Sequence, residues 1–291
     1  MPRDEPRNEP ADSVLRAITD DGAFRVITAR TTQTVRAAIA AQKGRGPTAR
    51  TFADLITGAV LFRETMAPKL RVQGILTAPG GQGSLVADSH PSGDTRGLIQ
   101  LPDGHTDLDL SGGGLLKFMR TLPSGKINQG VVELQPAGGV SQALMAYMQT
   151  SEQVVSMVSV GTLTRGDGVI AAGGYMVQLL PEVEHGPLMV MTERLRDFES
   201  IEPQLGDHSF SPAWLLDQLL YGMPFTRLEE RPVSFNCWCS DLRVMSALAT
   251  LSRADIEELL SDGEVLFINC EYCGSEYRIL PSRLRGLLDE S

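Results

Sequence analysis

The sequence predicts an α+β protein with a large N-terminal domain, a helical linker and a small C-terminal domain. Its 291 residues exceed the size that one hydrophobic core usually organises, so a second, smaller unit is expected. Short β-type runs separated by Gly, Pro, Asn and Asp fill residues 70–181, which predicts antiparallel sheets. All four cysteines fall between Cys237 and Cys273, which places the small unit at the C-terminal end.

Two helices are expected near the start of the chain. Residues 31–44 and 48–66 carry apolar side chains at helical spacing, and they end at Gly44 and before Pro68. The second segment is apolar over one broad face, so we expect it to be a core helix.

The stretch 70–181 reads as strands with one interrupting helix at 140–153. It contains a formal G-x-G-x-x-A pattern at Gly166, Gly168 and Ala171, which in other contexts binds dinucleotides. A glycine pair follows at once and would break the helix that such a site requires. We therefore interpret this stretch as a hairpin turn between two strands.

Residues 187–201 and 212–223 are again helical, and the second segment opens with Ser211 as N-cap and Pro212 at the first helical position. We assign residues 185–230 to a helical linker whose stability depends on docking. The proline-rich, charged residues 1–12 are predicted to be disordered, and residues 13–184 to form the N-terminal α+β domain.

Residues 231–291 form the predicted C-terminal domain. A short strand should lead into the first cysteines, followed by helices at 241–251 and 253–263, a strand at 264–270 and a last helix after Pro281. The segment contains six arginines and ten acidic residues and no lysine, for a net charge of -4.

Composition narrows the possible partners. The formal net charge of -10 and a pI near 5.0 disfavour nucleic-acid and anionic-membrane binding, which need surplus lysine and arginine. No apolar run approaches the ~18–20 residues of a membrane helix, and the charged, proline-broken start does not resemble a signal peptide. We expect a cytoplasmic protein, in which close cysteines indicate a metal site or redox groups before structural disulfides.

The cysteines form a C-x-C pair, Cys237 and Cys239, and a C-x-x-C pair, Cys270 and Cys273, separated by residues 240–269. Two short pairs of this kind can supply four thiolates to one tetrahedral Zn²⁺. The four histidines lie outside this region, which favours an all-cysteine site. Spacing alone leaves two interpretations open, a structural zinc site that stabilises a small domain and a redox-active centre.

The motifs "FNCWCS" and "CEYCGSEY", preceded by "AYMQTSEQ" and "GVIAAGGYMVQLLP", resemble the bacterial redox-regulated chaperonin family known as heat-shock protein thirty-three. The resemblance extends from about Ser13 to Leu287, and the N-terminal extension departs from the family pattern.

The resemblance implies a molecular chaperone, not an enzyme, that holds unfolding client proteins under oxidative and heat stress. It implies one Zn²⁺ on Cys237, Cys239, Cys270 and Cys273 in the reduced, inactive state. It also implies disulfides Cys237–Cys239 and Cys270–Cys273 with zinc release on activation, and a homodimer when oxidised. Two alternatives are a zinc-ribbon regulator that binds nucleic acid and a thiol oxidoreductase that uses Cys270 and Cys273.

Overall fold

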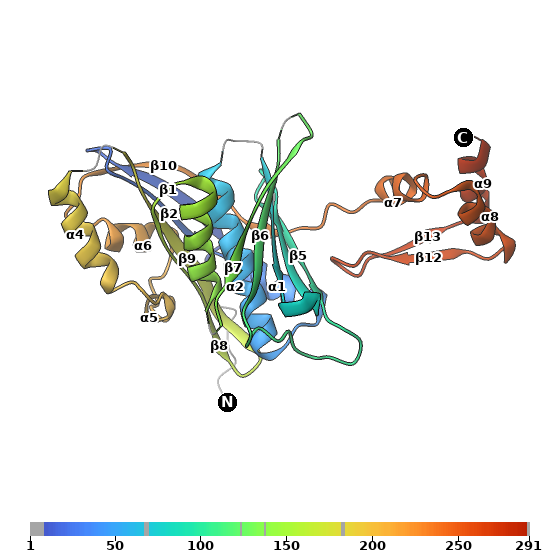
Figure 1. Ribbon diagram of the computed structural model, residues 1–291, viewed down its shortest axis with the longest axis horizontal. Helices are drawn as coiled ribbons and strands as arrows, with labels where there is room; N and C mark the ends of the chain where they lie inside the picture. The colour runs from blue at the N-terminus through green and yellow to red at the C-terminus, as the bar shows by residue number, and fades with distance from the viewer. Residues whose placement is uncertain (1–8, 67–69, 123, 137, 182–183, 290–291) are drawn as a thin grey trace. The chain divides into compact units, whose positions relative to one another are not determined.

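The computed structural model describes residues 9–66, 70–122, 124–136, 138–181 and 184–289 of the chain (Figure 1). Contacts divide the chain between Asn236 and Cys237 into two units. Each unit has its own apolar core, two cores in the first unit and one in the second.

The first sheet of the N-terminal unit has five strands, all antiparallel to their neighbours. Their order across the sheet is β10 (Phe225–Pro232), β1 (Ser13–Thr19), β2 (Phe24–Arg30), β9 (Gly168–Leu179) and β8 (Ser156–Arg165). Both faces of this sheet are covered. Val26 and Ile27 are adjacent in β2, point to opposite faces and are fully buried in different cores.

The second sheet has six strands in the order β11 (Ser234–Phe235), β5 (Asp94–Gln100), β4 (Ser84–Ser89), β3 (Arg71–Thr77), β6 (Gly114–Thr121) and β7 (Ile127–Leu134). All pairs are antiparallel except β11 with β5, which is parallel. The predicted hairpin is confirmed in the first sheet, where β8 and β9 pair across a turn with Gly166 at φ +58°.

Three helices form the layer between the sheets: α1 (Thr32–Gln42), α2 (Gly46–Thr65) and α3 (Val140–Tyr147), the last continued by a π-helical turn over Met148–Glu152. Helix α2 contacts strands of both sheets and is buried along most of its length, which confirms the predicted core helix (Figure 1). Its Phe62 packs against Phe118 of β6 and Tyr147 of α3, with ring centroids 4.7 and 5.3 Å away.

Helices α4 (His185–Arg196), α5 (Glu202–Leu205) and α6 (Pro212–Leu219) cover the other face of the five-stranded sheet (Figure 1). Ser211 caps α6 as expected, because its hydroxyl accepts a hydrogen bond from the Trp214 N–H. The three helices differ in how deeply they pack. Helix α6 buries Leu215, Leu216 and Leu219, whereas α4 buries only Met191.

After α6 the chain forms strand β10. This strand falls mostly within residues 185–230, for which only helices were predicted. β10 pairs with β1 from Thr19↔Phe225 to Ser13↔Pro232. A short strap, residues 233–236, then joins the edge of one sheet to the edge of the other. Its Val233, Ser234 and Asn236 N–H groups donate to the carbonyls of Asp12, Gly93 and Thr95 at 3.1–3.2 Å.

The close approach of this strap requires a glycine at position 93. Gly93 has φ +96°, and a Cβ added there would lie 2.1 Å from the Pro232 carbonyl oxygen. A side chain is therefore excluded by both backbone conformation and space.

The second unit, residues 237–291, consists of α7 (Asp241–Leu248), α8 (Arg253–Ser261), the hairpin β12 (Leu266–Asn269) and β13 (Glu276–Ile279), and α9 (Pro281–Asp289). Its core is small. Only four apolar side chains are buried in its described part: Leu248, Ile256, Ile279 and Leu284.

The predicted α+β class, with antiparallel sheets, several helices and a C-terminal cysteine cluster, is confirmed. Residues 1–8 of the predicted N-terminal extension lie outside the described residues, and Asp12 at its end is buried, where it accepts two hydrogen bonds from Thr34. The domain limits at 184 and 230 remain predictions. No helix within the described residues combines the length and apolar character needed to span a bilayer.

Candidate metal centre

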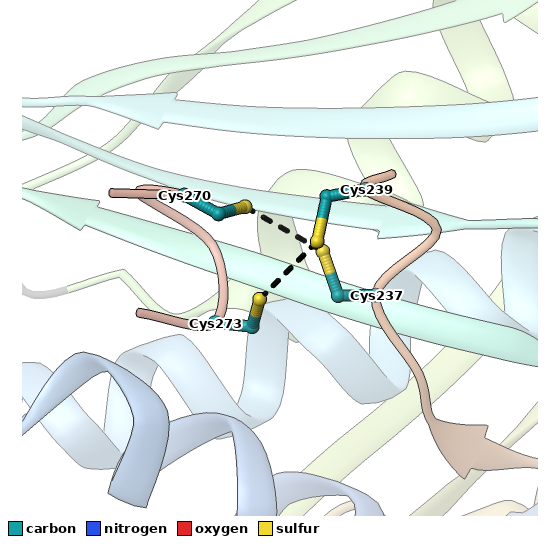
Figure 2. A group of neighbouring side chains, drawn as sticks. All are labelled: Cys237, Cys239, Cys270 and Cys273. Carbon is teal, nitrogen blue, oxygen red and sulfur yellow. Dashed lines mark hydrogen bonds between the residues drawn. The ribbon is translucent and has the colours of Figure 1, made fainter. Parts of the chain in front are cut away.

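The structure brings all four predicted cysteines together within the second unit. Cys237 and Cys239 lie in the extended segment before α7, and Cys270 and Cys273 lie in the turn between β12 and β13. Their sulfur atoms point toward one another and all lie within 4.8 Å (Figure 2). In the part of the chain that the structure describes, this is the one cluster of three or more His, Cys, Asp or Glu side chains suited to a metal ion.

The distances between the sulfurs match those of metal ligands. Cys237 Sγ lies 3.7 Å from Cys270 Sγ, and Cys239 Sγ lies 3.5 Å from Cys273 Sγ. A tetrahedron with Zn–S bonds of ~2.3 Å has sulfur atoms ~3.8 Å apart at its corners, whereas a disulfide joins them at ~2.05 Å. The arrangement therefore fits four separate ligands around one ion.

The turn that carries Cys270 and Cys273 is closed by its own backbone. The Cys270 N–H donates to the Ser275 carbonyl at 2.8 Å, and the Gly274 N–H donates to the Cys270 carbonyl at 2.7 Å. Gly274 has φ +73°, the left-handed conformation that glycine adopts without strain. The turn points both sulfurs to the same side, as a metal site requires.

Cys239 and Cys273 differ in acidity. Burial raises the pKa of Cys239 to about 12, although a hydrogen bond from the Tyr277 hydroxyl opposes that rise. Burial also acts to raise the pKa of Cys273, but hydrogen bonds from the Ser275 hydroxyl and backbone outweigh it, and the pKa falls to about 7. The Ser275 Oγ lies 3.2 Å from Cys273 Sγ. Of these two thiols, Cys273 of the C-x-x-C pair therefore ionises more readily.

Two interactions outside the cluster fix the helices that flank it. Ser240, directly after the C-x-C pair, caps α7 by accepting a hydrogen bond from the Arg243 N–H at 3.3 Å. Arg283 of α9 donates two hydrogen bonds to the carboxylate of Asp241, at 2.8 and 2.6 Å. This pair joins the first helix of the unit to the last one.

Sequence reasoning missed Ser275 and Tyr277 as neighbours of the cysteines. A signal for Ser275 was present, since a hydroxyl residue follows the C-x-x-C-G turn directly. Tyr277 contacts Cys239 from β13, and its pKa rises to about 12 because of the hydrogen bond to that sulfur. All four histidines lie in the N-terminal unit, outside the cysteine cluster.

The donor set fits Zn²⁺ better than the hard cations. Four partly buried thiols with no carboxylate among them are soft ligands, which select Zn²⁺ or Cu⁺ over Mg²⁺ and Ca²⁺. A closed set of four protein ligands is also typical of structural zinc sites. The site is thus compatible with the predicted zinc ion, whose identity remains a proposal.

Comparisons with known proteins agree with the fold and the cysteine cluster. A family model described as "Hsp33 protein" matches residues 12–280. The 33 kDa chaperonin of Syntrophotalea carbinolica is 30% identical and covers 95% of this chain and 99% of that protein. The 33 kDa chaperonin of Bacillus subtilis is also 30% identical, over 96% of this chain and 99% of its own length.

Among solved structures, the crystal structure of the 33 kDa chaperonin (heat shock protein 33 homolog) of Thermotoga maritima superposes with a TM-score of 0.81. It covers 97% of this chain and 99% of its own, at 22% sequence identity, and so confirms the fold. The family match across most of the sequence, together with relatives that share its full length, shows that this chain is a member of the Hsp33 family.

Proposed function

We propose that this chaperone is a holdase whose client binding is controlled by the oxidation state of Cys237, Cys239, Cys270 and Cys273. The observation that carries the proposal is the approach of four sulfurs from two separate segments to within 4.8 Å of one another, with one sulfur pair across the segments at 3.7 Å and another at 3.5 Å, in a chain of the Hsp33 family. In the reduced state the four side chains would hold one Zn²⁺ and client binding would be suppressed.

Bound zinc would keep the four sulfurs ionised and would cross-link the segment before α7 to the turn between β12 and β13. Ionised sulfur is the form that oxidants attack. Peroxide is a suitable oxidant. Each pair of thiolates would lose two electrons to one hydrogen peroxide, which takes up two protons and forms two molecules of water, while one S–S bond forms. Complete oxidation would give disulfides Cys237–Cys239 and Cys270–Cys273 and leave no thiolate for the metal.

Loss of the metal would remove much of what stabilises the second unit. Its described part buries four apolar side chains, and each contributes only ~1.5–3 kcal/mol. Structural zinc contributes ~10–16 kcal/mol of apparent binding free energy in small zinc domains. We therefore expect the oxidised unit to unfold.

Unfolding of the second unit would act on the segment that precedes it. Cys237 directly follows the strap 233–236, which is hydrogen-bonded to Asp12, just before β1, and to the β5 side of the second sheet, and β10 precedes the strap. Release of the strap and β10 would weaken the attachment of residues 185–230. Those residues cover a sheet face with buried Phe24, Val26 and Tyr175.

The apolar face uncovered in this way is the proposed client-binding surface. Unfolding proteins expose apolar side chains, so this surface would bind them without sequence specificity. We propose that the oxidised form is a homodimer. The net charge of -4 over residues 231–291 disfavours nucleic acid as a partner.

A thiol oxidoreductase is less well supported. Such enzymes place C-x-x-C at the start of a helix, where the helix dipole stabilises a thiolate. Here Cys270 and Cys273 lie in a turn that leads into strand β13.

The test compares reduced protein with protein treated with peroxide under mild heating. Zinc content, disulfide mapping and suppression of aggregation of a thermally unfolding protein are measured on the same samples. We expect one zinc per chain and little suppression before treatment, and zinc release, two disulfides and strong suppression afterwards. Equal suppression in both samples, or suppression that precedes zinc release, would refute redox control. Heating without peroxide is the control.

A further inference from the structure

Asp54 on α2 lies in a setting that the cysteine chemistry does not use. It lines a partly open cavity of about 430 Å³ in the N-terminal unit. The cavity wall is mainly apolar, with Leu76, Leu108, Leu134 and Val140 among its members. Of the described residues that line it, Asp54 is the only titratable one. Thr162 of β8 donates a hydrogen bond to Asp54 Oδ1 at 2.7 Å.

The carboxyl group is close to the ion pair that anchors α5. Arg50 precedes Asp54 by one helical turn on α2, so the two side chains share a face of the helix. The Arg50 guanidinium donates to Glu202 of α5 at 2.8 Å. Glu202 packs beside Gly161, the residue before Thr162, because a Cβ added at Gly161 would lie 3.2 Å from Glu202 Cδ.

The ion pair therefore reaches around an edge of the sheet. β8 is the last strand of the five-stranded sheet, with α2 on one side and α5 on the other. The Arg50 side chain extends from α2 and bonds to Glu202 of α5, whereas Asp54 of α2 accepts a hydrogen bond from the Thr162 hydroxyl of β8. Two carboxyl groups thus flank one guanidinium.

We propose that Asp54 is a proton-controlled latch for α5. When its carboxyl is neutral, Arg50 interacts with Glu202 alone and α5 is held against β8. When the carboxyl loses its proton, it attracts Arg50 and repels Glu202, and the anchor weakens. This latch acts through α5 and is independent of the oxidation state of the cysteines.

The charged surroundings of Asp54 set the pH at which the latch would act. Burial is the main cause that raises the pKa of Asp54 from 3.8 to about 7. The Thr162 hydrogen bond and the Arg50 charge act in the opposite direction, and the Glu202 charge adds to the rise. These are the groups from α2, β8 and α5 that act on the carboxyl, so a change near neutral pH would switch it.

The sign of the pH effect follows from the raised pKa. When α5 is undocked, Asp54 stays buried on α2 but loses the repelling charge of Glu202, and Arg50 is free to interact with it, so its pKa is lower than the value of about 7 in the docked state. The docked state is therefore favoured at low pH, and this advantage is lost as the pH rises through about 7. Docking of α5 should be looser at pH 8 than at pH 6.

The test measures amide exchange of residues 201–206 in the full reduced chain at pH 6 and pH 8, with correction for the pH dependence of chemical exchange. We expect about fivefold less protection at pH 8. A fivefold change lies at the upper end of what exposed ion pairs contribute and at the lower end of what coupled sites contribute. Asp54→Asn, which keeps the oxygen that accepts from Thr162, should abolish the difference. Asp107→Asn is the matched control, since Asp107 is an exposed carboxylate that interacts with Thr48 of α2.

A second measurement does not depend on the Asp54 variant folding well. The pKa of Asp54, followed by carboxyl ¹³C resonances, should fall in Glu202→Gln, because a repelling charge is removed. In the docked state this shift measures the coupling between the Asp54 and Glu202 charges on which the latch depends. An unchanged pKa in Glu202→Gln, or the same pH dependence of protection in wild type and Asp54→Asn, would overturn the latch.

Discussion

Replacing Leu216 by alanine should loosen helices α4–α6 without loosening the sheet layers on the other side. Leu216 is completely buried in the core between α6 and the five-stranded sheet. Truncation of a buried leucine costs ~2–5 kcal/mol, because apolar contact is lost and a cavity remains. At about 3 kcal/mol, an opening reaction that releases these helices becomes about a hundredfold more frequent.

Amide exchange of the reduced Leu216→Ala protein measures the opening of α4–α6 directly. We expect exchange in α4–α6 to accelerate by about a hundredfold and exchange in β3–β6 to stay nearly unchanged. The reduced variant should also suppress client aggregation, since the proposed binding surface is uncovered more often. Leu144→Ala is the matched control. Leu144 is equally buried, but in the core between the two sheets.

Two results would contradict the reasoning. Equal acceleration throughout the N-terminal unit would show that α4–α6 open only when the whole unit unfolds. Selective acceleration without any gain in aggregation suppression would show that the covered sheet face is not where clients bind. The Leu144→Ala variant should lose overall stability and gain no suppression in its folded state.

Three further outcomes are expected. Cys239→Ser should weaken zinc binding sharply in a chelator competition, because three thiolates remain, and a full zinc complement of unchanged affinity would exclude Cys239 as a ligand. On oxidation the Cys270–Cys273 disulfide should form before the Cys237–Cys239 disulfide, because C-x-C closes a smaller, more strained ring; timed thiol trapping with peptide mapping shows the order, and the reverse order contradicts it. Gly93→Ala should release the strap and speed exchange of the Ser234 and Asn236 amides, whereas Gly104→Ala, at another positive-φ glycine with open space around it, should leave them protected.

The cysteine cluster could be predicted because its information is local in sequence. Two short pairs separated by about thirty residues place the cysteines in two short segments, and the structure brings these segments together. What could not be predicted is which groups tune the sulfurs. Ser275 and Tyr277 act through the geometry of one turn and one strand, which only the folded hairpin defines.

Strand β10 shows why the linker region was only partly predicted. Its sequence, FTRLEERP, lacks the alternation of a half-buried strand, since most of its residues are exposed. It is a strand because it pairs with β1, about 210 residues earlier in the chain. Pairing over such a separation depends on the whole fold and leaves no local pattern. The helices α4 and α6, whose patterns are local, were predicted.

Residues 225–235, which contain β10 and β11, cover one edge of each sheet in the N-terminal unit. β10 pairs with β1 at one edge, and β11 pairs with the first residues of β5 at the other. Unpaired edge strands are templates for extended peptide, since their free N–H and C=O groups bond to any strand that aligns with them. Removal of residues 225–235 would create two such templates at once. Because Cys237 lies two residues beyond this segment, a disturbance at the cysteine cluster is well placed to expose both edges together.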